Sequence, residues 1–171
     1  MIKIKKANAS DTDLLALLGR VTFRESHGHF INDKNDLSNY LNKSYSVSKI
    51  KQDLNDPKNL FHIMYVNNLP VGYTKLVINA EHEGITSPNI CRLERIYILN
   101  DFIPLKIGQQ FLSFIEKKAK KLQLDTMWLT VYIKNFRAIR FYERNEFKAV
   151  GALNFPVNGT AYKNLVFSKK I

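Results

Sequence analysis

The sequence has 171 residues, of which 45% are hydrophobic and 12% aromatic, so it can bury a substantial core and is not the sequence of a disordered protein. This length fits one domain, and we expect residues 1–171 to form a single domain. No apolar run reaches the ~20 residues of a membrane-spanning helix, and the lone cysteine, Cys91, cannot form an internal disulfide. Together these features predict a protein of the cytoplasm.

The formal net charge of +11 attracts polyanions, so nucleic acids and phosphate-bearing ligands both have to be considered. The densest basic run lies between residues 117 and 121, on a predicted amphipathic helix whose charged face is expected to be solvated. The other basic residues are scattered along the chain. A coenzyme with several phosphates also needs basic neighbours, so charge alone does not decide between the two. Because the charges are scattered, a nucleic-acid partner is the less favoured expectation.

The first third of the chain predicts one strand and then three helices. Residues 2–7 alternate apolar and basic side chains, as a half-buried strand does. A polar loop at residues 26–29 separates the first helix from the second. The helices are expected from an N-cap at Ser10 to Phe23, from Asn35 to Leu41, and from Ser46 to the residue before Pro57.

The rest of the chain predicts six more strands and two more helices. A turn at residues 67–70 makes the first two of these strands a hairpin. The strands are expected at residues 60–66, 71–78, 91–99, 126–133, 147–155 and 161–168, and the helices at residues 108–122 and 136–144. The order β-α-α-α-β-β-β-α-β-α-β-β predicts an α/β (α+β) fold, with a mixed central sheet of about seven strands flanked by helices.

The candidate functional residues lie between Leu93 and Phe147. There a strand leads through a short loop into a helix that opens near Gly108. The start of a helix leaves backbone N–H groups unpaired and carries roughly half a positive charge, so it suits a pyrophosphate. A glycine at that place lets the backbone approach the phosphates closely. The histidines at positions 27 and 29 show no metal-ligand spacing, so no metal is expected.

Three segments of this region resemble the GNAT acetyltransferase superfamily. Leu93–Leu99 resembles the strand that pairs with the pantetheine arm of the coenzyme, and Ile103–Gly108 resembles the pyrophosphate loop. The signature Asn-x-x-Ala-x-x-Phe-Tyr-x-x-x-Gly-Phe is matched at Asn135, Ala138, Phe141, Tyr142 and Phe147. Within the superfamily, the chain resembles bacterial spermidine/spermine N-acetyltransferases of the PaiA type.

The resemblance implies an acetyl-CoA-dependent N-acetyltransferase that moves an acetyl group directly to a primary amine of a small molecule, such as a polyamine, in a ternary complex. Tyr142 is then the candidate acid that protonates the leaving thiolate, and Glu94 the candidate base that takes a proton from the amine. Glu94 has an alternative role in an ion pair with Arg92, Arg95 or a lysine. The residues expected to bind the coenzyme are Ile96, Tyr97, Ile98, Lys106, Ile107, Gly108, Gln109, Asn135, Ala138 and Phe141, and those expected to shape the acceptor site are His27, His29 and Phe30.

The chain departs from the family pattern at several positions. Ile103 replaces the usual Gln or Arg of the pyrophosphate loop, and Lys106 replaces its first glycine. A lysine does not adopt positive φ cheaply, so we expect a reshaped loop and weaker coenzyme binding, although the Lys106 ammonium could itself reach the phosphates. Glu146 replaces the glycine of the signature, and we expect Asn145 to take the left-handed cap in its place. The alternative to an enzyme is therefore a non-catalytic or regulatory binding module with the same fold.

The acceptor is not identified by these motifs. A polyamine is cationic and would be repelled by a chain of charge +11 unless acidic residues gather at the cleft. Four acidic residues of the acceptor-side helices are candidates for this: Asp33, Asp36, Asp53 and Asp56. We expect no membrane partner. A homodimer is the expected assembly if the final strands, residues 147–168, exchange between copies.

Overall fold

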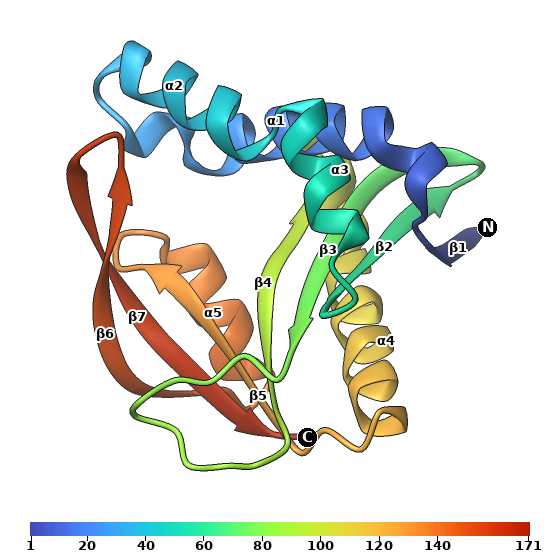
Figure 1. The fold of residues 1–171 in the computed structure, drawn as a ribbon, viewed down its shortest axis with the longest axis vertical. Coiled ribbons are helices and arrows are strands. Elements are labelled where there is room, and N and C mark those ends of the chain that lie inside the picture. Colours follow the sequence, from blue (N-terminus) through green and yellow to red (C-terminus); the bar gives the residue numbers. More distant parts are fainter.

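The computed structural model describes every residue from Met1 to Ile171. Its seven strands form one sheet in the order β1-β2-β3-β4-β5-β7-β6. Only β4 and β5 run parallel, and every other pair of neighbours is antiparallel. The predicted α+β fold, a mixed seven-stranded sheet flanked by helices, is confirmed (Figure 1).

The elements follow the predicted order. The strands are β1 (Ile2–Lys6), β2 (Asn59–Val66), β3 (Leu69–Ile78), β4 (Ile90–Ile98), β5 (Thr126–Tyr132), β6 (Lys148–Val157) and β7 (Thr160–Lys170). The helices are α1 (Thr12–His27), α2 (Lys34–Ser44), α3 (Val47–Asn55), α4 (Ile107–Lys121) and α5 (Phe136–Arg144). Short 3-10 turns occupy Ala9–Asp11, Gly28–Phe30 and Asn100–Leu105.

The helices cover both faces of the sheet. On one face, α1, α2 and α3 pack on the side chains of Phe61, Ile63 and Tyr73. On the other face, α4 and α5 pack on residues such as Met64 and Leu93. Alternate residues of each strand thus enter two separate core layers, as the two-residue period of a strand requires. None of the helices is long and apolar enough to cross a membrane.

The start and end of α1 differ from the prediction. The N-cap expected at Ser10 is wrong, because Asn8 accepts a hydrogen bond from the Ser10 N–H at 2.8 Å and begins a 3-10 turn ahead of α1. The polar segment that begins at Ser26 was expected to be a loop, but α1 continues through His27. Ser26 Oγ donates to the Thr22 carbonyl at 2.7 Å, so this polar side chain bonds back to the helix.

Two positions that replace family glycines adopt the left-handed conformation. Lys106 has a φ of 56°, so the lysine keeps the backbone geometry that a glycine would take, at a cost of about 1 kcal/mol. Glu146 has a φ of 66°, whereas Asn145 stays at −99°. The left-handed cap expected at Asn145 is therefore wrong. The Asn145 side chain instead donates to the Phe141 carbonyl at 2.8 Å.

The two parallel strands separate soon after they meet. β4 pairs with β5 only over Ile90–Arg92, opposite Thr126–Trp128. Figure 1 shows the two strands diverging beyond this point, with α5 beside the opening. From Leu93 onwards the β5-facing edge of β4 has no partner strand. Its peptide groups are therefore available to a ligand of extended shape.

A β-bulge lies in β4 beside this opening. Lys75 pairs with Arg95, and the next residue of β3, Leu76, pairs with Leu93, which leaves Glu94 as the extra residue. A bulge reverses the alternation of side chains that follow it. As a result Leu93 and Ile96 both contact the core layer of α4 and α5, although their positions differ by three.

Candidate active site

The opening between β4 and β5 leads into a cavity of about 640 Å³, called here the larger cavity. Three stretches of chain supply most of its wall: the end of β4, the start of α4, and α5. The structure brings most of the predicted coenzyme residues together there: Ile96, Tyr97, Ile98, Lys106, Gly108, Gln109, Asn135, Ala138 and Phe141. Ile107 is the exception, because its side chain is buried in the core and only its backbone can face a ligand.

The start of α4 is open for an anion. Lys106 is the N-cap residue, and no side chain caps the helix there. Gly108 lines the cavity, and a Cβ added to it would lie 3.6 Å from Ile98 Cδ1 and 3.8 Å from Phe141 Cε2. These are ordinary contacts, so packing within the protein does not require a glycine. The free N–H groups and the open space beside Gly108 fit a phosphate group.

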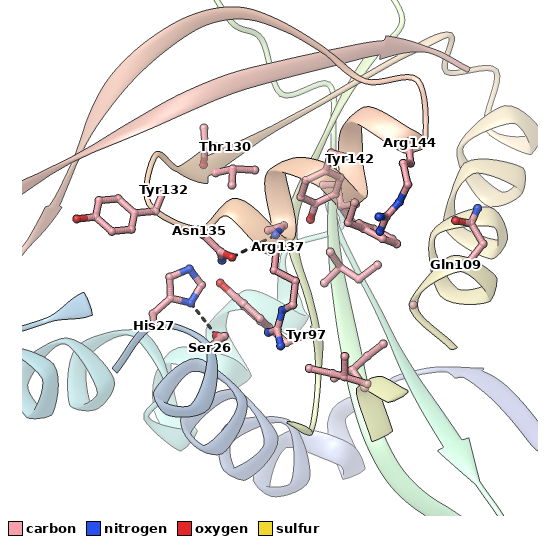
Figure 2. Close-up of a pocket in the computed structure, with 18 of the residues that line it drawn as sticks. Ser26, His27, Tyr97, Gln109, Thr130, Tyr132, Asn135, Arg137, Tyr142 and Arg144 are labelled. Atoms are coloured by element: carbon pink, nitrogen blue, oxygen red, sulfur yellow. Dashed lines mark hydrogen bonds between the residues drawn. The ribbon is translucent and has the colours of Figure 1, made fainter. Parts of the chain in front are cut away.

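Two arginines that the sequence analysis missed also line the larger cavity. Arg137 and Arg144 lie on α5, seven residues apart and therefore on the same side of the helix. Arg144 at the end of α5 and Gln109 at the start of α4 both face the cavity (Figure 2). The sequence contains the information needed to predict them, because both arginines lie between residues of the signature that spans α5. Together with Lys106 they make this cavity attractive to a polyanion.

Tyr142 points its hydroxyl into the larger cavity (Figure 2). Its ring is held by Phe141 and Phe147, with ring centroids 5.3 and 5.6 Å away. The hydroxyl makes no hydrogen bond within the protein. Burial raises the pKa of Tyr142 above its ordinary value, so the phenol stays protonated at neutral pH and can donate a proton.

Asn135 begins α5 and borders the same cavity. Its Oδ1 accepts a hydrogen bond from the Ala138 N–H at 3.2 Å, and this bond caps the start of the helix. This bond fixes the side chain and leaves its amide nitrogen without a protein partner. Asn135 therefore caps the helix and has a free amide N–H that is able to donate to a ligand in the cavity.

Glu94, the bulge residue, forms ion pairs and also faces the opening. Its Oε1 lies 2.9 Å from Lys75 Nζ and 3.7 Å from Arg95 Nε. Burial alone would raise the pKa of Glu94, but the two cations outweigh it and the pKa lies below its ordinary value. The side chain is thus a carboxylate at neutral pH, and the predicted ion pair with an arginine and a lysine is present.

A smaller cavity of about 300 Å³ adjoins the larger one on the side of α1 and α2. Five residues line both cavities and so join them into one cleft: His27, Glu94, Tyr97, Thr130 and Tyr132. Phe30 lines the smaller cavity only. His29 is exposed and lines neither cavity, although its ring lies 3.9 Å from the ring of Phe30.

His27 lies where the two cavities meet. Ser26 Oγ is 2.7 Å from its Nδ1, and its ring stacks on Phe23 at 4.7 Å. Burial, with smaller contributions from His29 and Arg137, lowers the pKa of His27 from 6.5 to about 4. The imidazole is therefore neutral at pH 7 and adds no positive charge to the cleft.

The acidic residues expected to attract a cationic acceptor do not reach the cleft. None of the four lines either cavity. Asp53 is buried in ion pairs with Lys49 and Lys75, and Asp36 accepts a hydrogen bond from Asn158. Asp33 caps α2, and Asp56 accepts from the backbone N–H of Lys58. Glu94 is the only carboxylate that lines the cleft, so the expected acidic cluster is wrong.

The comparison with protein families gives one match. The model of the acetyltransferase (GNAT) family matches residues 25–147. The matched range runs from the end of α1 to the residue before β6. It therefore contains β4, α4 and α5, which form the larger cavity.

Solved structures with the same fold cover the whole chain. A PaiA N-acetyltransferase from Thermoplasma acidophilum, solved in complex with coenzyme A, has a TM-score of 0.77 and 22% identity over 100% of this chain and 99% of that one. NAA60 from Arabidopsis thaliana, solved with a bisubstrate analogue, has a TM-score of 0.75 and 15% identity over 100% and 99% of the two chains. An N-acetyltransferase from Staphylococcus aureus Mu50 has a TM-score of 0.72 and 18% identity over 99% and 97%. At these identities the likeness shows the shared fold.

Proposed function

This chain belongs to the GNAT acetyltransferase family, and from that premise we propose that it is an N-acetyltransferase that passes an acetyl group from acetyl-CoA directly to the amine of a small molecule. The observation that carries the proposal is the continuous cleft. Its larger cavity contains the Tyr142 hydroxyl, and its junction with the smaller cavity contains Glu94. A thioester and an amine can therefore be held together, as direct transfer requires.

We assign coenzyme binding to the larger cavity. The uncapped start of α4, together with Lys106 and Arg144, suits the phosphates. The unpaired edge of β4 at Ile96 and Ile98 suits the extended pantetheine arm, whose amide groups can bond to it as a neighbouring strand would. Acetyl-CoA, when bound, supplies the activated acetyl thioester. One peptide N–H of β4 then donates to the thioester carbonyl oxygen.

Tyr142 is the proposed acid. Aminolysis of a thioester releases a thiolate, which leaves more easily when a proton is delivered to the sulfur. The phenol is protonated at neutral pH and its hydroxyl has no competing partner in the protein, although burial, which raises its pKa, makes it a weaker acid than a free phenol. We propose that the Tyr142 O–H donates its proton to the departing sulfur and regains a proton from water, so that the proton lost by the amine balances the one gained by the thiolate.

Glu94 is the residue that we propose to bind the acceptor amine. An alkylammonium has an ordinary pKa about six units above that of a carboxylate, so full proton transfer between them is uphill by roughly 8 kcal/mol. Lys75 and Arg95 widen this gap, because they lower the pKa of Glu94. We propose that Glu94 holds the amine at the junction and that the proton passes through water to solvent.

The non-catalytic alternative has little support. Lys106 keeps the left-handed geometry of the glycine that it replaces, and Glu146 does the same at the second position. Both residues thus adopt the left-handed backbone that a glycine takes at the lowest cost. The positive charge at Lys106 adds attraction for phosphates rather than removing it.

We also keep two expectations as proposals. The buried Cys91 thiol, whose pKa burial raises to about 12, forms no disulfide and is consistent with a reducing compartment, so we place the activity in the cytoplasm. β6 forms the far edge of the sheet and exposes residues 148–152. We propose this edge as the contact of a homodimer.

A kinetic experiment tests the proposed function. Initial rates are measured over a grid of acetyl-CoA and amine concentrations for the wild type, Tyr142→Phe and the control Tyr65→Phe, whose side chain lies outside both cavities. We expect intersecting reciprocal plots and a kcat at least about tenfold lower for Tyr142→Phe, with unchanged coenzyme affinity. An unaltered kcat in Tyr142→Phe would remove Tyr142 from the mechanism. Parallel plots would contradict direct transfer.

A further inference from the structure

The smaller cavity has a feature that an acetyltransferase for polyamines would not need. Two arginines, Arg92 and Arg95, line it, and both come from β4. They share one face of the sheet because of the bulge at Glu94. In a regular strand, residues 92 and 95 would point to opposite faces.

Arg95 is buried and incompletely paired. Its side chain is 9% exposed, and its Nη1 has no hydrogen-bond partner. The guanidinium lies over the ring of Tyr45, 4.5 Å from the centroid. Buried charged groups in proteins are normally paired and hydrogen-bonded, so an incompletely paired guanidinium in the wall of a cavity favours an anionic partner.

The charges around Arg95 are not balanced. Asp53 and Glu94 share the Lys75 ammonium, at 3.0 and 2.9 Å. Arg95 approaches Glu94 only through Nε, at 3.7 Å, and Arg92 makes no ion pair. The Nε of Arg92 is likewise buried without a partner. The smaller cavity therefore has an excess of positive charge, which an anionic ligand would neutralise.

The remaining wall of the smaller cavity is largely aromatic. Phe23, Tyr40, Phe155 and Tyr162 come from four different elements and leave the cavity suited to an apolar body. Aromatic rings can also hold a cation, but here Arg95 already lies against Tyr45 and adds its own positive charge. A second cation in the cavity would meet repulsion.

We propose that the smaller cavity binds the carboxylate of the acceptor, so that the acceptor is an amino carboxylic acid, in the simplest case an α-amino acid with an apolar side chain. Arg95 pairs with the carboxylate through the part of its guanidinium that lines the cavity, with Arg92 beside it. Glu94, the preceding residue, holds the amine at the junction with the larger cavity. In an α-amino acid the two charged groups are bonded to one carbon, which matches the closeness of Arg95 and Glu94. This inference rests on the proposed function.

The test measures binding of matched ligand pairs to the protein saturated with coenzyme A. Each amino acid is compared by calorimetry with the amine that lacks its carboxylate: phenylalanine with phenethylamine, tyrosine with tyramine, and leucine with isoamylamine. We expect at least one acid to bind about tenfold or more tightly than its amine, and spermidine to bind more weakly than that acid. Equal binding within every pair, or tighter binding of spermidine, would overturn the inference.

Arginine variants then test whether Arg95 and Arg92 cause the preference for the amino acid over its matched amine. Arg95→Gln is expected to abolish the preference for the acid, and Arg95→Lys to retain part of it, because the charge remains while the two-pronged geometry is lost. Arg92→Gln is a second variant at a less buried position. Arg140→Gln is the matched control, since Arg140 is exposed on α5 and lines neither cavity. A preference that survives in both Arg95→Gln and Arg92→Gln would also overturn the inference.

The failure of this inference is distinguishable from the failure of the proposed function. If the protein binds coenzyme A and acetylates amines with no regard to a carboxylate, only the carboxylate site is wrong. If it does not bind coenzyme A, the proposed function is wrong, and ligand preference in the smaller cavity can still be measured on the protein alone.

Discussion

The two cavities meet at Glu94 but are built in different ways. The larger cavity depends on backbone features, namely the unpaired edge of β4 and the uncapped start of α4, and three stretches of chain supply most of its wall. The smaller cavity depends on side chains from α1, α2, β4, β5, β6 and β7. A binding site made of backbone groups keeps its ligand when nearby side chains are substituted. A site made of side chains changes its ligand specificity after a few substitutions. The fold can therefore keep one coenzyme while its acceptor varies.

The largest effect is expected where the two cavities join. Glu94→Gln keeps the shape of the side chain and removes the charge that is proposed to hold the amine, so kcat/KM should fall about a hundredfold. Coenzyme affinity, which belongs to the larger cavity, should stay nearly constant. Steady-state kinetics and calorimetry measure the two quantities separately.

Glu143→Gln is the control for this substitution, because Glu143 is exposed on α5 and lines neither cavity. An equal loss of coenzyme affinity in Glu94→Gln would show that the two cavities are not separable. An unchanged rate would leave Glu94 as a structural ion pair only.

The next effect concerns the backbone character of the larger cavity. Gly108→Ala should weaken coenzyme A binding by about tenfold, because the new methyl group occupies space that we assign to the phosphates. Stability should rise by up to about 1 kcal/mol, since alanine is the better helix former. Calorimetry and thermal unfolding check the two halves of this prediction.

Gly84→Ala is the matched control, because a Cβ at Gly84 would make only ordinary contacts, the nearest 3.4 Å from His82 Nδ1, and Gly84 lines neither cavity. Unchanged coenzyme affinity in Gly108→Ala would argue that the phosphates bind elsewhere. Lower stability would instead point to a packing role for the glycine.

A smaller effect is expected at Lys106. Lys106→Gln keeps a side chain in the left-handed position and removes the ammonium, so coenzyme affinity should fall about fivefold at low salt and less at high salt. Lys106→Gly removes the same charge but also relieves the backbone strain. Affinity in Lys106→Gly that exceeds the wild-type value would show that the lysine impairs the loop rather than supporting it.

These positions also show what the sequence could and could not predict. Most residues of the larger cavity could be predicted, because they belong to three sequence segments that follow one another in the order typical of the family. These segments are the strand, the pyrophosphate loop and the signature helix. The bulge at Glu94 could not be predicted, since residues 93–98 read as a regular strand and a bulge depends on pairing with β3. Without the bulge, Arg92 and Arg95 cannot be placed on one face. The expected acidic cluster failed for a related reason, because the sequence does not show that Lys49 and Lys75 engage Asp53.

The smallest effect lies outside both cavities. His62 is buried beside Phe114, and burial, with nearby Lys118 and Lys6, lowers its pKa from 6.5 to about 4. The unfolded chain therefore binds a proton that the folded chain does not, and stability is lost as the pH falls from about 6.5 towards 4. At pH 5.5 the loss should be about 1 kcal/mol from this residue.

His62→Phe removes this titration and should roughly halve the loss of unfolding free energy over that range, because His27, whose pKa burial also lowers to about 4, still contributes. Denaturant unfolding at pH 7 and pH 5.5 measures the difference. An identical slope in the wild type and the variant would mean that His62 does not titrate as described.

The most direct test of the account is the titration of coenzyme A into the wild-type protein by calorimetry. In the proposed function, the left-handed Lys106 and the open start of α4 form a working phosphate site, which this titration tests. The proposed function predicts saturable binding of one coenzyme per chain, with a dissociation constant between about 1 μM and 1 mM, as is usual for enzyme substrates. The absence of any binding heat at millimolar coenzyme A would contradict it.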